Sequence, residues 1–302
     1  MKSNKLWLVY AVTTTLAWGV WGALIDITAE AGFPETLGYC VWALTMLIPA
    51  FIALKKINWK IEYNLRSVVL GCAVGFLGAG GQLILFKTLR IAPAYLVFPF
   101  ISLSPLMTII LAIIISKEKT KKIGWTGIIL ALIAGVLLSY SKGDSGFTIG
   151  IWVLFAFLVF AAWGIQGFII SYANETMKAE SIFFYMMLTG ILLIPVALIM
   201  TDFSQPINWG FRGPYLAALI QILNAFGALF LVYAFRYGKA MIVSPLTNAG
   251  APVITIIISL IIYQTLPNTV NAIGMILAVI AAFLMSLAEE SQDMEVQPSE
   301  GP

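Results

Sequence analysis

The sequence predicts an all-α, polytopic membrane protein in which ten transmembrane helices form two inverted five-helix repeats. Three observations lead to this fold class. Of the 302 residues, 61% are hydrophobic and only 10% are charged, whereas a typical soluble domain has about 25% charged residues. Apolar runs of roughly 20 residues, the length that crosses a bilayer, recur along almost the whole chain. Residues of the first half also reappear in the second half at a nearly constant spacing.

The apolar runs give the expected spans in order. Spans are predicted near residues 6–27, 36–54, 67–88, 93–115, 123–140, 149–171, 181–200, 214–235, 240–263 and 268–287. Lys2 and Lys5 precede the first run as in a secretory signal, but that run is long and has a counterpart in the second half, so we expect a retained span. The acidic segment 289–302 follows the last run and is expected to be a disordered cytoplasmic tail.

The basic residues predict the orientation of these spans. Thirteen of the 17 Lys and Arg residues fall in the N-terminal segment and in alternate connections: Lys2, Lys5, Lys55, Lys56, Lys60, Arg66, Lys117, Lys119, Lys121, Lys122, Lys178, Arg236 and Lys239. By the positive-inside bias, we expect a multi-pass protein with both termini in the cytoplasm. The net charge of +3 therefore reflects loop placement, and no nucleic-acid partner is expected.

The two halves of the chain repeat each other. The hexapeptide Ala17–Gly22 (Ala-Trp-Gly-Val-Trp-Gly) matches 162–167 (Ala-Trp-Gly-Ile-Gln-Gly), 145 residues later. A second match joins Arg90, Ala94 and Pro99 to Arg236, Ala240 and Pro245. We expect a first repeat over 1–142 and a second over 143–288. Five crossings are an odd number, so the second repeat enters the membrane from the opposite side, which is the basis of alternating access in transporters.

Several motifs together resemble the drug/metabolite transporter superfamily, specifically its EamA-type members. They are the ten spans, the paired Ala-Trp-Gly motif, and the segment from Pro105-Leu106 through Lys117-Glu118-Lys119 to Gly124-Trp125-Thr126-Gly127. The resemblance covers nearly the entire chain and implies a carrier of small organic solutes in the cell inner (plasma) membrane, with a central cavity lined by both halves. The acidic residue that the family usually has at the end of the fourth span is matched by Glu118, whereas the equivalent position in the ninth span is Gln264-Thr265.

Polar side chains inside apolar spans are costly unless they are paired or face a cavity, so they are the candidates for substrate binding. The predicted substrate-binding residues are Trp18, Gln82, Lys87, Ser102, Trp163, Gln166, Asn224 and Asn248. Trp18 and Trp163 hold equivalent repeat positions and are expected at comparable depths. Asn224 shares a helix face with Gln221, which suits either a substrate-binding wall or a polar clamp between helices. Lys87 attracts an anionic substrate if it faces the cavity and has no specific role if it turns outward.

Prolines and one acidic residue complete the candidate set. Pro99, Pro105, Pro245 and Pro252 remove backbone donors from the fourth and ninth spans, which indicates a hinge or gate, although simple helix kinks give the same pattern. Any proton coupling is expected to depend on Asp26, near the outer end of the first span, on Lys87 or on ionisation of the substrate, and exchange or facilitated movement is equally admissible. Two cysteines and no histidine offer no metal site, and no cofactor is expected.

The leading hypothesis is a secondary transporter for a small organic metabolite such as an amino acid, a sugar or a nucleoside, acting as a monomer or homodimer in the lipid bilayer. A multidrug or toxic-metabolite exporter is the alternative within the same class. A lipid-handling or structural membrane partner is the alternative from another class, and it predicts that the polar groups of the spans pack against each other. An enzyme is not expected, because catalytic motifs and deep carboxylate pairs are absent from the sequence.

Overall fold

The computed structural model describes residues 5–91, 97, 101, 103–138, 151–263 and 268–296. All regular secondary structure in these residues is helical. The elements are α1 (Leu6–Leu24), α2 (Asp26–Glu30), α3 (Glu35–Thr45), α4 (Leu47–Lys56), α5 (Leu65–Leu89), α7 (Ser104–Ile114), α8 (Lys122–Leu138), α9 (Ile151–Asn174), α10 (Ala179–Leu192), α11 (Ile194–Met200), the π-helical turn η1 (Phe211–Tyr215), α12 (Leu216–Tyr237), α13 (Ala240–Tyr263) and α14 (Thr269–Val296).

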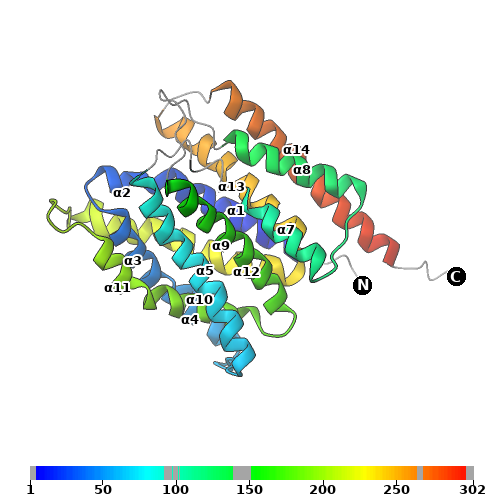
Figure 1. The fold of residues 1–302 in the computed structure, drawn as a ribbon, viewed down its shortest axis with the longest axis horizontal. Coiled ribbons are helices and arrows are strands. Elements are labelled where there is room, and N and C mark those ends of the chain that lie inside the picture. The colour runs from blue at the N-terminus through cyan, green and yellow to red at the C-terminus, as the bar shows by residue number, and fades with distance from the viewer. Residues whose placement is uncertain are drawn as a thin grey trace.

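Six helical segments are long and apolar enough to cross a membrane: Leu6–Glu30, Glu35–Lys56, Leu65–Leu89, Ile151–Asn174, Ala179–Met200 and Phe211–Tyr237. Four shorter apolar segments, Ser104–Ile114, Lys122–Leu137, Ala240–Thr255 and Thr269–Met285, lie at the other four predicted positions, so the count of ten spans stays a prediction. The start of α1 and the end of α14 lie at the same end of the molecule (Figure 1), which we call the proximal end. The structure differs from expectation in α14, which continues to Val296, into the segment predicted as a tail.

The second span of each repeat is broken near its middle. In the first repeat α3 ends at Thr45 and α4 begins at Leu47, and in the second repeat α10 ends at Leu192 and α11 begins at Ile194. Pro49 and Pro195 follow these breaks. Proline lacks the N–H that would continue the helical bonding and crowds the carbonyl four residues earlier, which explains why both second spans are two short helices.

Close helix packing forms the centre of the molecule. Helix α1 packs against α12 and α13, α5 packs against α9 and α10, and α7 packs against α9 and α13. The helices α8 and α14 run side by side at one edge (Figure 1). Glycines permit these approaches: a Cβ on Gly19 would lie 3.0 Å from the Ala251 carbonyl oxygen, and a Cβ on Gly164 would lie 2.6 Å from the Ser104 carbonyl oxygen.

The two repeats make matching contacts. The Thr108 hydroxyl of α7 donates to the Gly164 carbonyl of α9 at 2.8 Å. In the same way, the Thr255 hydroxyl of α13 donates to the Gly19 carbonyl of α1 at 3.0 Å. The glycines are 145 residues apart and the threonines 147. The repeat read from the sequence is therefore also a repeat of tertiary contacts.

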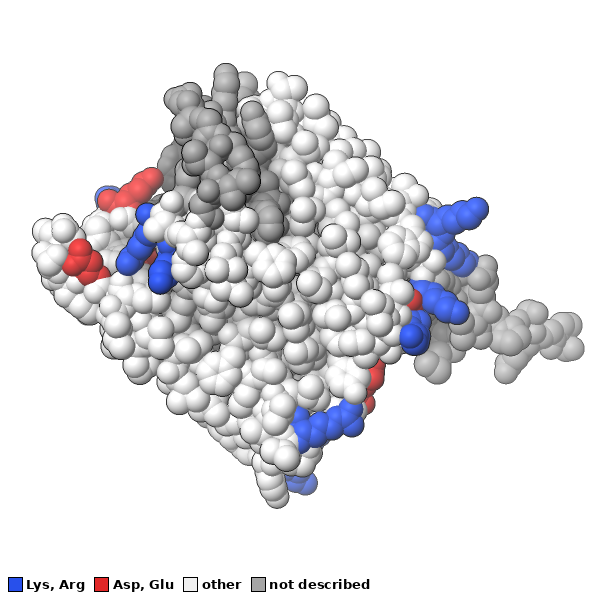
Figure 2. Space-filling view, in the orientation of Figure 1, with Lys and Arg blue, Asp and Glu red and all other residues white. Residues whose placement is uncertain are grey.

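Charged side chains gather at two opposite ends of the face shown in Figure 2, and a broad uncharged band separates them. This distribution suits a bilayer around the band. Tryptophans near span ends indicate interfacial anchors, and we expected this role for Trp7, Trp59, Trp125, Trp152 and Trp209. Trp59, Trp125 and Trp209 are exposed as expected, but Trp7 and Trp152 are 5% and 8% exposed, so they belong to the core of the bundle instead.

Candidate functional site

Trp18 and Trp163 point into the bundle from repeat-equivalent positions. Each lies nine residues, or two and a half helical turns, after an exposed apolar residue, Val9 in α1 and Leu154 in α9, so the rings face away from the apolar surface. The Trp18 indole N–H donates to the Asn224 carbonyl at 3.4 Å, and the indole N–H of its counterpart donates to a carbonyl of α5, as described next. Both indole N–H groups are thus bound to backbone, and the pyrrole edges of the rings pack on Gly227 and Gly81 of the neighbouring helices.

Gln82 and Gln166 belong to α5 and α9, two helices that pack against each other. The indole N–H of Trp163 donates to the Gly78 carbonyl at 3.2 Å, and a Cβ added to Gly78 would overlap the Gln166 amide. Gln82 is one turn after Gly78 on α5, so it shares the face that packs on α9. Both glutamine side chains are half-buried, and neither has a hydrogen-bond partner within the described residues. Their amides are therefore available to bind another molecule.

Asn224 lies on the face of α12 that packs against α1. Three residues before it, the buried Gln221 accepts a hydrogen bond from the Trp21 indole N–H at 2.9 Å. Three residues after it, Gly227 lies against the Trp18 ring, 2.5 Å from an added Cβ. The Asn224 backbone carbonyl accepts from Trp18, but its side-chain amide has no partner in the described part of the chain. The clamp between helices is therefore made by Gln221, whereas the Asn224 amide stays unpaired.

Asn248 is exposed on the inner side of α13. Ile257, an exposed apolar residue, lies nine residues later and so points in the opposite direction. The Asn248 amide donates to the Ser244 carbonyl one turn earlier at 2.9 Å. Ser244 in turn donates to the Thr108 hydroxyl of α7 at 3.3 Å. These groups provide a neutral polar surface where α13 meets α7.

The predicted gating and coupling residues have varied surroundings. Pro105 lies in the first turn of α7, a position that tolerates proline without a kink. Pro245 and Pro252 lie inside α13, which remains helical around both. Asp26 is the first residue of α2, after a break at Ile25, and its side chain lies outside what the structure describes. Pro99 and Ser102 are likewise outside the described residues.

Lys87 lies at the end of α5 that is distant from the proximal end, which we call the distal end. Its side chain is exposed, and its Nζ lies 5.0 Å from the centroid of the Phe155 ring. Nearby, Arg90 donates to the Met200 carbonyl at 3.0 Å. Hydrogen bonds from the Ser204 hydroxyl and amide hold the pKa of Asp202 below its ordinary value. This end therefore carries charges of both signs.

At the proximal end, three side chains form a cluster that the sequence reading missed and that we call the proximal latch: Lys56, Glu180 and Tyr233. The Lys56 Nζ lies 3.1 Å from the Glu180 carboxylate, the Tyr233 hydroxyl donates to that carboxylate at 2.8 Å, and Lys56 donates to the Tyr233 hydroxyl at 3.3 Å. Charged residues at span ends suggested only orientation, and no periodicity signals a pairing over 124 residues. The proximal latch joins α4, α10 and α12.

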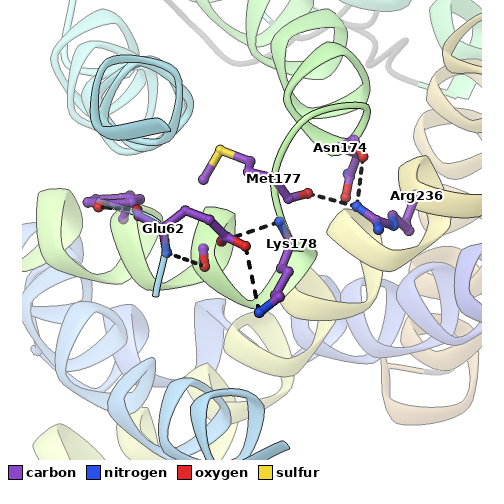
Figure 3. Close-up of polar contacts among 7 residues, drawn as sticks. Glu62, Asn174, Met177, Lys178 and Arg236 are labelled. Atoms are coloured by element: carbon purple, nitrogen blue, oxygen red, sulfur yellow. Dashed lines mark hydrogen bonds and ion pairs between the residues drawn. The ribbon is translucent and has the colours of Figure 1, made fainter. Parts of the chain in front are cut away.

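A second group of contacts closes the same end (Figure 3). Arg236 donates to the Asn174 and Met177 carbonyls at 2.7 Å each and so satisfies the end of α9. Beside it, the Glu62 carboxylate lies 3.8 Å from the Lys178 Nζ and accepts from the Lys178 amide at 3.4 Å. The loop between α4 and α5 is thereby tied to the loop between α9 and α10.

Glu118, the residue singled out by the family resemblance, stabilises a helix start. Its two carboxylate oxygens accept the Ala240 and Met241 amides at 3.0 Å each. These are the first N–H groups of α13, which have no partner within their own helix, and the carboxylate also interacts favourably with the helix dipole. Glu118 therefore joins the end of α7 in the first repeat to the start of α13 in the second.

The fold and the site together define a multi-pass membrane protein built from two helical repeats, with neutral polar side chains turned inward and charges at its two ends. The sequence profile of the EamA-like transporter family matches residues 5–140 and again residues 150–287. The chain therefore belongs to the EamA-like transporter family, and is a membrane transporter of the drug/metabolite transporter type.

Comparisons with other proteins add information on the fold. A solved chain, titled only "Crystal structure of protein", is 18% identical and superimposes with a TM-score of 0.72 over 94% of this chain and 99% of that chain. At this identity the likeness shows the fold alone. A search of curated proteins found no match.

Proposed function

We propose that the chain is a secondary transporter that moves a small organic metabolite across the cell inner (plasma) membrane by alternating access. One observation carries this proposal: the side-chain amides of Gln82, Gln166 and Asn224 face into the bundle without a partner among the described residues. An unpaired polar group in a membrane is costly, so such groups are expected to face water or a solute. A structural membrane protein would instead be expected to bond these amides to one another.

Alternating access is supported by the repeats. We propose that 1–142 and 143–288 are the two units, inverted relative to each other, with both termini in the cytoplasm. In this arrangement, the matching contacts of Trp18 and Trp163 lie on two sides of one central site. The contacts of the proximal latch and of Arg236 hold one end together, which suits a carrier whose solute enters from the other end. Pro99, Pro105, Pro245 and Pro252 remain our candidates for the hinge, and Asp26 for proton coupling.

The test is transport by the purified full chain in proteoliposomes, with radiolabelled amino acids, sugars and nucleosides offered in turn. For a solute that is taken up, Gln82→Leu is expected to raise the half-saturation concentration about tenfold, because a polar group of the bound solute loses its partner. Phe76→Leu, on the exposed side of the same helix, is the matched control and is expected to behave as wild type. Uptake of no solute, or equal effects of both substitutions, would contradict the proposal.

A further inference from the structure

Along the helices that carry the site amides, no ionisable side chain lies within four residues of an amide. Along α5, α9, α12 and α13, the charged residue nearest to a site amide is Lys87, five residues after Gln82, which is about 7.5 Å of helix rise. Gln166 and Asn248 are each nine residues from the nearest charge, Glu175 just after α9 and Lys239 just before α13, and Asn224 is twelve residues from Arg236. Lys87 itself is exposed and lies against the Phe155 ring.

We propose that the solute carried by this site has no net charge, an inference that rests on the proposed transport function. An ion moved to the middle of a membrane needs a counter-charge to replace its hydration, and the helices that carry the site amides supply none within four residues of an amide. Each amide instead offers a carbonyl acceptor and two N–H donors, and the two tryptophan rings offer flat apolar surfaces. This combination fits an uncharged solute that has both hydrogen-bonding groups and a ring, such as a nucleoside or a cyclic sugar.

The experiment compares uncharged and charged probes on the purified chain in proteoliposomes. Uridine and glucose represent uncharged solutes, and tetraethylammonium and benzenesulfonate represent ions of either sign that do not readily cross a protein-free bilayer. We expect uptake of at least one uncharged probe and no uptake of either ion. Gln166→Glu, which adds a carboxylate with little change of shape, is expected to reduce uptake of the uncharged probe at least tenfold and to create binding of tetraethylammonium.

The two proposals fail in different ways. If the wild-type chain takes up an ion and none of the uncharged probes, the inference about charge is overturned while transport stands. If it moves no probe at all, the transport function is contradicted and the inference falls with it. Glu175→Gln changes a charge at an exposed position immediately after α9. It controls for the general effect of changing a charge.

A second inference comes from the distal end and depends on different residues. The spacing between the two repeats assigns each residue of the proximal latch a counterpart in the other repeat. Glu180 corresponds to Glu35 at the spacing of 145 seen for the tryptophans, and Tyr233 corresponds to Lys87 at the spacing of 146 seen for Arg90 and Arg236. Lys56 corresponds to Asp202 at the spacing of 146 between Pro49 and Pro195. The counterparts again combine a lysine with carboxylates.

In the structure these counterparts are not joined. Glu35 is exposed and makes no ion pair among the described residues, and Lys87 lies against the Phe155 ring. Asp202 is bonded to Ser204. Arg90 donates to the Met200 carbonyl, whereas its counterpart Arg236 binds the end of α9. Thus the residues that correspond to the proximal contacts are present at the distal end, but no ion pair joins them to one another among the described residues.

We infer that Glu35, Lys87 and Asp202 form a distal latch when the proximal latch opens. In a protein with two equivalent repeats, the second state is reached when each repeat adopts the arrangement of the other. Lys87 then leaves the Phe155 ring and lies between the two carboxylates, as Lys56 now pairs with Glu180. Arg90 likewise moves to the carbonyls of Ala29 and Gly32, the positions that match Asn174 and Met177.

Cysteine cross-linking tests the distal latch without knowledge of the solute. In a background with Cys40→Ser and Cys72→Ser, we introduce Glu35→Cys with Lys87→Cys and oxidise the chain in membranes. We expect a disulfide to form as the distal end closes. A third change, Asn248→Cys, reports access to the site: its labelling by a membrane-impermeant maleimide from the distal side is expected to fall at least fivefold after oxidation and to return after reduction.

The control pair is Glu30→Cys with Lys87→Cys. Glu30 is an exposed acid at the same end that has no counterpart in the proximal latch, and it is expected to cross-link poorly. The distal latch is overturned if the 35/87 pair forms no disulfide in well-folded protein, or if labelling at position 248 is unchanged when the disulfide is present. Equal cross-linking of the control pair overturns it as well.

Discussion

Gly71→Ala is expected to destabilise the protein by about 3 kcal/mol, at the upper end of the usual cost of overpacking. An added Cβ would lie 2.7 Å from the Cβ of Tyr185, which belongs to the body of α10 and cannot rotate away. Helix α5 must then move from α10, and the Tyr185 hydroxyl, which donates to the Glu62 carbonyl at 2.7 Å, moves with it. The measurement is the urea or thermal unfolding midpoint of the detergent-solubilised chain.

Gly80→Ala is the matched control in the same helix. No atom lies within 4 Å of a Cβ added there, and alanine favours a helix over glycine by up to about 1 kcal/mol. We expect Gly80→Ala to leave stability unchanged or to raise it slightly. Equal losses from the two substitutions would mean that helix α5 does not depend on its close approach to α10.

Glu118→Gln is expected to cost about 2 kcal/mol of stability, because hydrogen bonds to a charged group contribute about 1.5–3 kcal/mol. The carboxylate accepts from Ala240 and Met241 with its two oxygens, but a glutamine has only one oxygen, and its NH₂ group would face an N–H. The start of α13 would therefore separate from α7. We expect a lower unfolding midpoint and faster amide hydrogen exchange at 240–243.

Glu175→Gln makes the same chemical change at an exposed side chain for which the structure shows no bond. It is expected to leave both the midpoint and the exchange rates unchanged. If Glu118→Gln behaves like this control, the carboxylate does not hold the helix start in solution.

The sequence allowed the helical class, the position of the apolar segments and the repeat to be predicted, because each depends on local pattern. The length of an apolar run can be read from neighbouring residues alone. The Trp-Gly and Arg-Pro matches between the two halves can be read directly from the sequence. The break in the second spans could have been inferred from Pro49 and Pro195. Trp7 shows the limit of such reasoning: its place at a span end indicated an interface, but the position is covered by other helices and the ring is 5% exposed.

The candidate site was only partly predictable for the same reason. The polar residues of the spans could be named, but not which of them already have partners. The Trp18 indole N–H binds a backbone carbonyl, and Gln221 rather than Asn224 accepts from Trp21. The proximal latch was missed because Lys56 and Glu180 are far apart in sequence and each looks like an ordinary charge at a membrane boundary.

The breaks in the two second spans separate the short helices at one end of the molecule from those at the other end. Helix α3 packs with α11, and α4 packs with α10, so each short helix packs with the non-equivalent short helix of the other repeat. Lys56 and Glu180 belong to the α4–α10 pair, whereas Glu35 begins α3 and Asp202 follows α11. Each end of the bundle thus has its own short pair, and the break between the two helices of a span allows one pair to tilt without moving the other.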